Sequence, residues 1–310
     1  MKNTFPLALL GAALASSLPA MAQDPVRIGF ITTLSTPAGY LGEDARDAFR
    51  LAMEQQGNTL GGVPVELVVE DDGLQPATGK QIADRMSLDG ISIYTGVIFS
   101  NVLAAGVNTA VKNDGFYLSN NPGPSNLAGE QCMPHYFAAA YQNDVPHEMA
   151  GLAANDLGYK NLVILAPNYQ AGRDALAGFK RTFKGHVTEI YTKLNQLDFS
   201  VELARIRSQA PDAIYQLHPG GAGINFAKQY GSSGLNKSVP MLVPIFSMDE
   251  RILSATGKVA EGVNIVSGWN PQSDNPANQA FVKAFNEKYN RAPTVYAAQA
   301  DDTARLIGSA

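Results

Sequence analysis

Short apolar runs alternate with amphipathic segments along most of this chain, and no other feature constrains its fold as strongly. The first run, Val26 to Thr32, predicts a strand. The next segment, Glu43 to Gln56, carries apolar residues at intervals of three and four, which is typical of a helix packed on one face. Such pairs recur until a strand predicted at Tyr136 to Ala140. Strands that alternate with helices are typical of a parallel sheet flanked by helices, so the sequence predicts an α/β protein.

The alternation restarts near Tyr141, and this indicates a second domain of the same kind. The second series begins with a helix predicted at His147 to Asp156 and ends with a strand predicted at Gly262 to Ser267. Two more helices are predicted after it, at Gln279 to Tyr289 and at Tyr296 to Ile307. The 310 residues are enough for two cores, because a single core stops growing at about 250–300 residues.

The first 22 residues predict a secretory signal peptide. Lys2 supplies the charged start, an apolar run extends from Phe5 to Leu18, and Ala20-Met21-Ala22 supplies the small residues of a cleavage site. The run is shorter than the ~20 residues that span a bilayer. We therefore expect cleavage after Ala22 and a mature protein that is free in the periplasm.

Charge and residue types narrow the function. The 23 basic and 28 acidic residues give a formal net charge of −5 without a basic stripe, so nucleic acid is not an expected partner. The patterns G-x-S-x-G, H-E-x-x-H, G-x-G-x-x-G and the P-loop are absent from the sequence, and its four histidines are not paired at metal-ligand spacing. Cys132, the single cysteine, is expected to be buried and structural rather than a nucleophile. The sequence therefore predicts no enzyme, no metal and no cofactor.

Three local motifs have two interpretations each. Gly220-Gly221-Ala222-Gly223 precedes a predicted helix and favours a tight turn, with anion binding at the helix N-terminus as the alternative. Asp71-Asp72 favours a solvated turn over an acid–base pair. Asp249-Glu250 opens a predicted helix, where carboxylates cap the positive end of the helix dipole.

The loops that follow the predicted strands are rich in hydroxyl, amide and aromatic side chains and poor in charged ones. In open parallel sheets, ligands bind outside the carboxyl ends of the strands. This composition suits the holding of a small polar-aromatic molecule rather than its chemical conversion.

From Val26 to Ile307 the sequence resembles the periplasmic type I substrate-binding proteins of the branched-chain amino acid ABC transporter class. The stretches that carry the resemblance are IGFITTLSTPAGYLGEDARDAFRLAMEQQ, VVEDD followed by PATGKQIADRM, TGVIFSNV, DFSVELARIRSQAPDAIY and NPANQAFVKAFNEKYNRAPTVYAAQADD. The resemblance implies two lobes, joined by three hinge strands, that close on one ligand. Lobe 1 is then expected to comprise residues 24–140 and 270–310, and lobe 2 residues 141–269. The family usually continues beyond the position of Ala310, so a truncated sequence is expected.

The resemblance also implies a binding pocket, and this sequence differs from the family at several of the pocket positions. Ser100 matches the serine that binds a ligand α-carboxylate, whereas Gly123 stands where the family uses a threonine. Ile245 or Phe246 stands where the family commonly places the glutamate that pairs with an α-ammonium. Ala171 and Pro219 replace two pocket tyrosines. The expected ligand-binding residues are Tyr40, Leu41, Ile98, Phe99, Ser100, Asn120, Asn121, Gly123, Tyr141, Tyr169, His218, Pro219, Phe246, Trp269 and Tyr296.

The missing glutamate points to a ligand without an ammonium group. A buried, unpaired ammonium costs several kcal/mol, whereas micromolar affinity amounts to only about −8 kcal/mol. We therefore expect a small carboxylate such as an aromatic acid, delivered by a monomer to an ABC permease in the inner membrane. Leucine, isoleucine or valine is the alternative if Asp249 takes the place of the glutamate. A ligand-sensing receptor subunit and an exported hydrolase are the alternatives from other classes.

Overall fold

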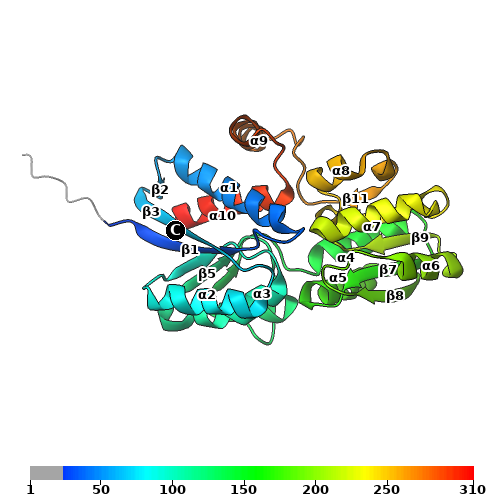
Figure 1. Ribbon diagram of the computed structural model, residues 1–310, viewed down its shortest axis with the longest axis horizontal. Helices are drawn as coiled ribbons and strands as arrows, with labels where there is room; N and C mark the ends of the chain where they lie inside the picture. Colours follow the sequence, from blue (N-terminus) through cyan, green and yellow to red (C-terminus); the bar gives the residue numbers. More distant parts are fainter. Residues whose placement is uncertain (1–23) are drawn as a thin grey trace, which may run out of the picture.

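The computed structural model describes residues 24–310, so the predicted signal peptide lies outside the described residues. Two α/β lobes lie side by side along the longest axis of the molecule (Figure 1). We call the six-stranded sheet and its helices lobe 1, and the five-stranded sheet and its helices lobe 2. The prediction of an α/β protein with two parallel-sheet lobes is confirmed.

The sheet of lobe 1 has the strand order β2-β3-β1-β4-β5-β6. All neighbouring pairs are parallel except β2 and β3. The strands are β1 (Val26–Thr32), β2 (Thr59–Leu60), β3 (Val63–Asp71), β4 (Ile93–Thr95), β5 (Phe116–Ser119) and β6 (Tyr136–Ala138).

The sheet of lobe 2 has the strand order β11-β10-β9-β7-β8, and all of its neighbouring pairs are parallel. Its strands are β7 (Asn161–Pro167), β8 (His186–Thr192), β9 (Ala213–Gln216), β10 (Met241–Pro244) and β11 (Asn264–Val266). Without the short β2, both sheets have the doubly wound order 2-1-3-4-5. In that order the chain reverses direction across the sheet between strands 1 and 3, and ligands bind outside the carboxyl ends there.

Helices cover both faces of each sheet, which explains why the central strands are almost wholly apolar. In lobe 1, α10 packs beside α1, and α2 packs beside α3 (Figure 1). The helices are α1 (Gly39–Gln55), α2 (Pro76–Leu88), α3 (Ser100–Ala110), α4 (Val145–Asp156), α5 (Gln170–Thr182), α6 (Ser200–Gln209), α7 (Gly220–Ser232), α8 (Glu250–Thr256), α9 (Pro276–Tyr289) and α10 (Val295–Ser309). Within residues 24–310, no helix is both long and apolar enough to cross a membrane.

Three expectations about local structure are wrong. Gly220 to Gly223 form the first turn of α7 rather than a turn before it. Only glycine fits at positions 221 and 223, because Pro37 and the His218 carbonyl approach them closely. Asp72 is buried rather than solvated, since its carboxylate accepts hydrogen bonds from the Thr33 hydroxyl and the Leu74 N–H. Cys132 is exposed rather than buried. The predicted capping role of Asp249 is confirmed: its carboxylate accepts from the first N–H groups of α8.

Candidate functional site

A cavity lies between the lobes at the carboxyl ends of both sheets. Lobe 1 supplies its wall from the loops after β4 and β5 and from α10, namely Ile98, Phe99, Asn121, Pro122 and Tyr296. The rest of the wall comes from lobe 2 and from the segment that crosses to it after β6: Tyr141, Asn143, His147, Tyr169, Ala171, Leu217, Pro219 and Phe246. The wall thus contains the loops after β4, β7 and β9, which flank the reversal points of the two sheets.

Three helices begin at the cavity wall. Phe99, Tyr169 and Pro219 are the N-cap residues of α3, α5 and α7, and none of them makes a side-chain capping hydrogen bond. The first N–H groups of a helix lack intrahelical partners and form the positive end of its dipole. One of them, the Ala171 N–H of α5, donates to the Ser100 Oγ across the lobes at 2.9 Å. The convergence of helix N-termini suits an anionic group of a ligand.

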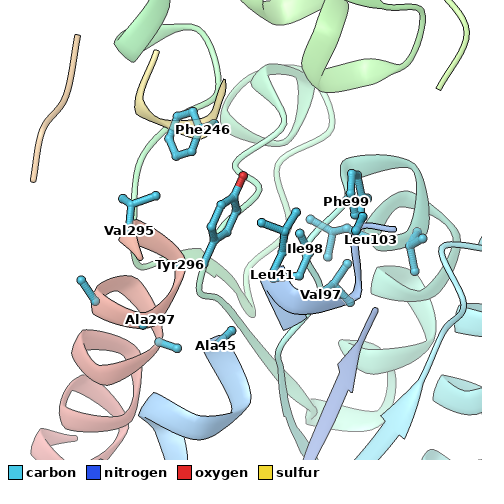
Figure 2. Close-up of a cluster of buried hydrophobic side chains, with 14 of the residues drawn as sticks. Leu41, Ala45, Val97, Ile98, Phe99, Leu103, Phe246, Val295, Tyr296 and Ala297 are labelled. Carbon is cyan, nitrogen blue, oxygen red and sulfur yellow. The ribbon is translucent and has the colours of Figure 1, made fainter. Parts of the chain in front are cut away.

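The rest of the wall is aromatic. Phe246 lies 5.2 Å from Tyr141 and 5.9 Å from Tyr296 between ring centroids. Figure 2 shows Tyr296 rising from the first turn of α10 toward Phe246, with Phe99 and Ile98 on the neighbouring loop. Phe99 in turn lies 6.4 Å from Tyr169 across the lobes. Such an arrangement suits a flat apolar body, because aromatic pairs at these distances are themselves favourable.

The wall carries no Asp, Glu, Lys or Arg side chain. Burial lowers the pKa of His147 to about 3, so its ring is neutral at physiological pH. Burial also raises the pKa of Tyr169 and Tyr296, so both phenols stay protonated. No carboxylate of the wall is therefore available to pair with an ammonium group.

Asp249 does not take the place of the missing glutamate. Its carboxylate caps α8 and accepts a hydrogen bond from the Tyr40 hydroxyl of lobe 1 at 2.8 Å, and it does not belong to the cavity wall. Burial raises the pKa of Asp249 to about 7, against the hydrogen bonds of the Ile252 N–H and Tyr40, which lower it.

Eight of the residues expected from the sequence lie on this wall. They are Ile98, Phe99, Asn121, Tyr141, Tyr169, Pro219, Phe246 and Tyr296. Ser100 lies directly behind it, fully buried and bonded to Ala171.

The structure places the remaining six elsewhere, each because it has another partner. Leu41 is enclosed in the core of lobe 1, and Tyr40 is bonded to Asp249. The side-chain Oδ1 of Asn120 accepts from the Gly96 N–H, and Gly123 approaches the Tyr141 carbonyl too closely for a side chain. His218 is hydrogen-bonded to Thr192 and Gln216 in the core of lobe 2. Trp269 lines a separate surface cavity, and its indole N–H donates to Asn278.

Five wall residues are absent from the sequence-based set: Pro122, Asn143, His147, Ala171 and Leu217. Ala171 and Pro122 lie within loops that the sequence does single out, so the loop pattern comes close to finding them. His147 carries no such signal because it begins the helix predicted at His147 to Asp156, and Asn143 carries none because it precedes that helix outside the predicted loops.

Outside the cavity, several contacts hold the lobes together, among them three near α1. The Gly221 N–H of α7 donates to the Pro37 carbonyl at 3.1 Å, and Tyr40 donates to Asp249. Arg251 of α8 bonds the buried Asp44 of α1 at 2.9 Å. The structure is therefore a closed form, with a cavity enclosed by two lobes.

Fold and site together define a two-lobed protein that encloses a small molecule. The sequence profile of the family described as periplasmic binding protein matches residues 25–310, and the chain belongs to this family. Among curated relatives, Leu/Ile/Val-binding protein homolog 6 of Brucella melitensis is 26% identical, over 91% of this chain and 74% of that protein. The resemblance drawn from the sequence is confirmed, and family members of this kind are extracytoplasmic solute-binding proteins.

Solved structures agree with the fold. A solute-binding protein of an ABC transporter from R. palustris, in complex with benzoate, has a TM-score of 0.87 and 28% identity, covering 91% of this chain and 79% of its own. Another from Rhodopseudomonas palustris BisB5, in complex with 3,4-dihydroxybenzoic acid, has a TM-score of 0.86 and 25% identity, covering 93% and 80%. LivJ of Streptococcus pneumoniae, in complex with isoleucine, has a TM-score of 0.82 at 19% identity, covers 92% of this chain and 83% of its own, and shares the fold alone.

Proposed function

We propose that this protein is the solute-binding component of an ABC transporter and that it captures an aromatic carboxylate between its lobes. The observation that carries the proposal is the cavity wall, which is aromatic, has no charged side chain and contains three helix N-termini. A carboxylate is stabilised by the helix N-termini, and an aromatic ring by the surrounding tyrosines and phenylalanines.

An amino acid fits this wall less well. Its ammonium would be enclosed without a carboxylate partner, at a cost of several kcal/mol. The structural neighbours in complex with benzoate and 3,4-dihydroxybenzoic acid support the aromatic acid. The Leu/Ile/Val-binding homologues favour the alternative, a branched-chain amino acid.

We also propose how the protein reaches the periplasm and its permease. Cleavage after Ala22 releases the mature chain into the periplasm, where it works as a monomer. The closed, loaded form then docks on a permease of the inner membrane, which receives the carboxylate.

Ligand screening by thermal shift and calorimetry tests this function on the mature chain. Benzoate, the hydroxybenzoates and phenylpropanoid acids are compared with leucine, isoleucine and valine. A ligand at 100 times its Kd stabilises the folded state by about 2.7 kcal/mol, which is readily measured. We expect a shift with aromatic acids. A shift with the branched-chain amino acids alone would overturn the proposal.

A further inference from the structure

His147 is a polar member of the cavity wall to which the sequence assigned no role. It lies in the first turn of α4, is 3% exposed and lines the cavity. Its Nδ1 is hydrogen-bonded to the hydroxyl of Tyr215, a fully buried residue of β9 whose ring stacks on Phe179 at 4.5 Å. This partner on a central strand fixes the orientation of the imidazole ring.

The other ring nitrogen of His147 is open. No group among residues 24–310 hydrogen-bonds Nε2, and protein atoms do not seal it off completely. Because the ring lines the cavity, Nε2 is the nitrogen that a ligand can reach. The ring is neutral, so Nε2 either donates or accepts one hydrogen bond, depending on which way the Tyr215 hydroxyl is turned.

The position of His147 separates it from the anion-binding end of the cavity. Its backbone N–H donates to the Asp144 carbonyl at 3.0 Å, and that carbonyl packs against Gly178 of α5. Gly178 and Ala171 are seven positions apart on α5, which corresponds to about 10 Å along the helix axis, and Ala171 lies at the N-terminal end of that helix. His147 and Ala171 belong to different helices of the same wall, so a ring whose carboxylate lies near Ala171 presents another part of its edge to His147.

We propose that His147 selects ligands with a hydroxyl group on the aromatic ring, through a hydrogen bond from Nε2. A hydroxyl both donates and accepts, so it satisfies either tautomer of the neutral imidazole. A ring without a hydroxyl leaves Nε2 unpaired in an enclosed site, and sites of this kind reject such analogues strongly. This inference rests on the proposed function, because it assigns the subclass of aromatic acid that the cavity takes.

Two variants of His147 test the roles of its two ring nitrogens one at a time. In His147→Asn the amide takes the place of Nδ1, keeps a partner for Tyr215 and leaves nothing at Nε2. In His147→Gln the amide reaches the place of Nε2. Calorimetry measures the Kd of benzoate and of 2-, 3- and 4-hydroxybenzoate for each protein, and the ratio within one protein is unaffected by a change in its stability.

We expect the wild type to bind one hydroxybenzoate isomer at least tenfold more tightly than benzoate. His147→Asn should reduce that ratio to near one while benzoate still binds, and His147→Gln should restore most of it. Equal affinity of the wild type for benzoate and all three isomers overturns the inference. So does an unchanged ratio in His147→Asn, which would mean that the ring only supports Tyr215 or contacts the carboxylate. If the wild type binds none of the aromatic acids, the proposed function itself fails, and the inference fails with it.

Discussion

At the scale of single residues, we propose that Phe246 decides which charge the cavity accepts. It follows β10 on the wall of lobe 2 and packs against Tyr141 and Tyr296. In the resembling family, a glutamate that pairs with an ammonium stands at this position or one residue earlier. An apolar ring here removes that partner and adds a surface for another ring.

Phe246→Glu should reverse the preference of the cavity. A buried carboxylate beside the carboxylate of an aromatic acid is unfavourable, so we expect the affinity for benzoate-type ligands to fall at least about 100-fold, equivalent to about 3 kcal/mol. Calorimetry with benzoate, 4-hydroxybenzoate and leucine measures the change. Phe246→Leu, which keeps the site apolar, is the matched control and should lose less. An undiminished affinity in Phe246→Glu would place the ligand away from Phe246.

At the scale of elements, the N-terminus of α7 touches the loop before α1. A Cβ at Gly221 would lie 2.5 Å from the Cβ of Pro37 and 2.9 Å from its carbonyl oxygen. The Gly221 N–H donates to the same carbonyl. Closure of the two lobes thus depends on a backbone without a side chain at this point.

Gly221→Ala should weaken ligand binding without unfolding either lobe. The added methyl group holds α7 away from Pro37, and overpacking of this kind costs about 1–3 kcal/mol, so we expect roughly tenfold lower affinity. Calorimetry measures the affinity, and thermal unfolding reports on the fold. Lys228→Ala, on the exposed face of α7, should leave both unchanged. If Gly221→Ala binds as tightly as the wild type, the lobes do not need to close here.

Asp249 at the start of α8 should make ligand affinity depend on pH. In the closed form, burial raises the pKa of the Asp249 carboxyl from an ordinary value near 3.8 to about 7; the Glu250 and Asp44 carboxyls add to this rise, whereas hydrogen bonds from the Ile252 N–H and the Tyr40 hydroxyl oppose it. The closed form therefore holds a proton that a more solvated Asp249 releases. Closure is favoured at low pH, and this contribution is lost as pH rises toward about 7.

We expect the Kd of an aromatic acid to rise several-fold between pH 5 and pH 8, a range in which the ligand carboxylate stays ionised. Calorimetry at several pH values measures this slope. Asp249→Asn should flatten it. Glu250→Gln is the control for the neighbouring carboxyl, whose pKa is also raised by burial, and should retain most of the slope. A steeper slope in Asp249→Asn than in the wild type would contradict the assignment.

At the scale of the whole molecule, one ion-pair network joins the lobes outside the cavity wall. Asp44 is fully buried and accepts hydrogen bonds from Arg291 and Thr294 within lobe 1 and from Arg251 of lobe 2. Removal of Arg251 leaves Asp44 with two partners, so lobe 1 keeps its structure. The contact therefore contributes to closure more than to the stability of either lobe.

Arg251→Met should shift the molecule toward an open form. A partly buried pair of this kind contributes about 1 kcal/mol, which corresponds to a roughly fivefold loss of affinity. Small-angle scattering of the ligand-free protein should show a larger radius of gyration than the wild type. Lys80→Ala, which breaks the exposed pair with Asp84, should change neither quantity. An unchanged radius and affinity in Arg251→Met would show that this pair does not hold the closed form.

Local patterns in the sequence determined the strands and helices of this protein and its two-lobed α/β architecture. The apolar runs of β1 and β7 and the periodic helices after them are visible without a structure, because burial on both faces of a sheet and on one face of a helix leaves distinct patterns. The loops that carry Phe99, Asn121 and Tyr169 could also be predicted, since strand carboxyl ends form the binding edge of such sheets.

Only the tertiary structure decided which residues of those loops meet. Asn143 and His147 belong to a segment that crosses between the lobes, and their place on the wall depends on how the lobes close. Tyr40 and Asp249, 209 positions apart, bond to each other rather than to a ligand. Periodicity reports which face of an element is buried, whereas contacts between distant segments depend on the packing of whole lobes, and no local pattern encodes that packing.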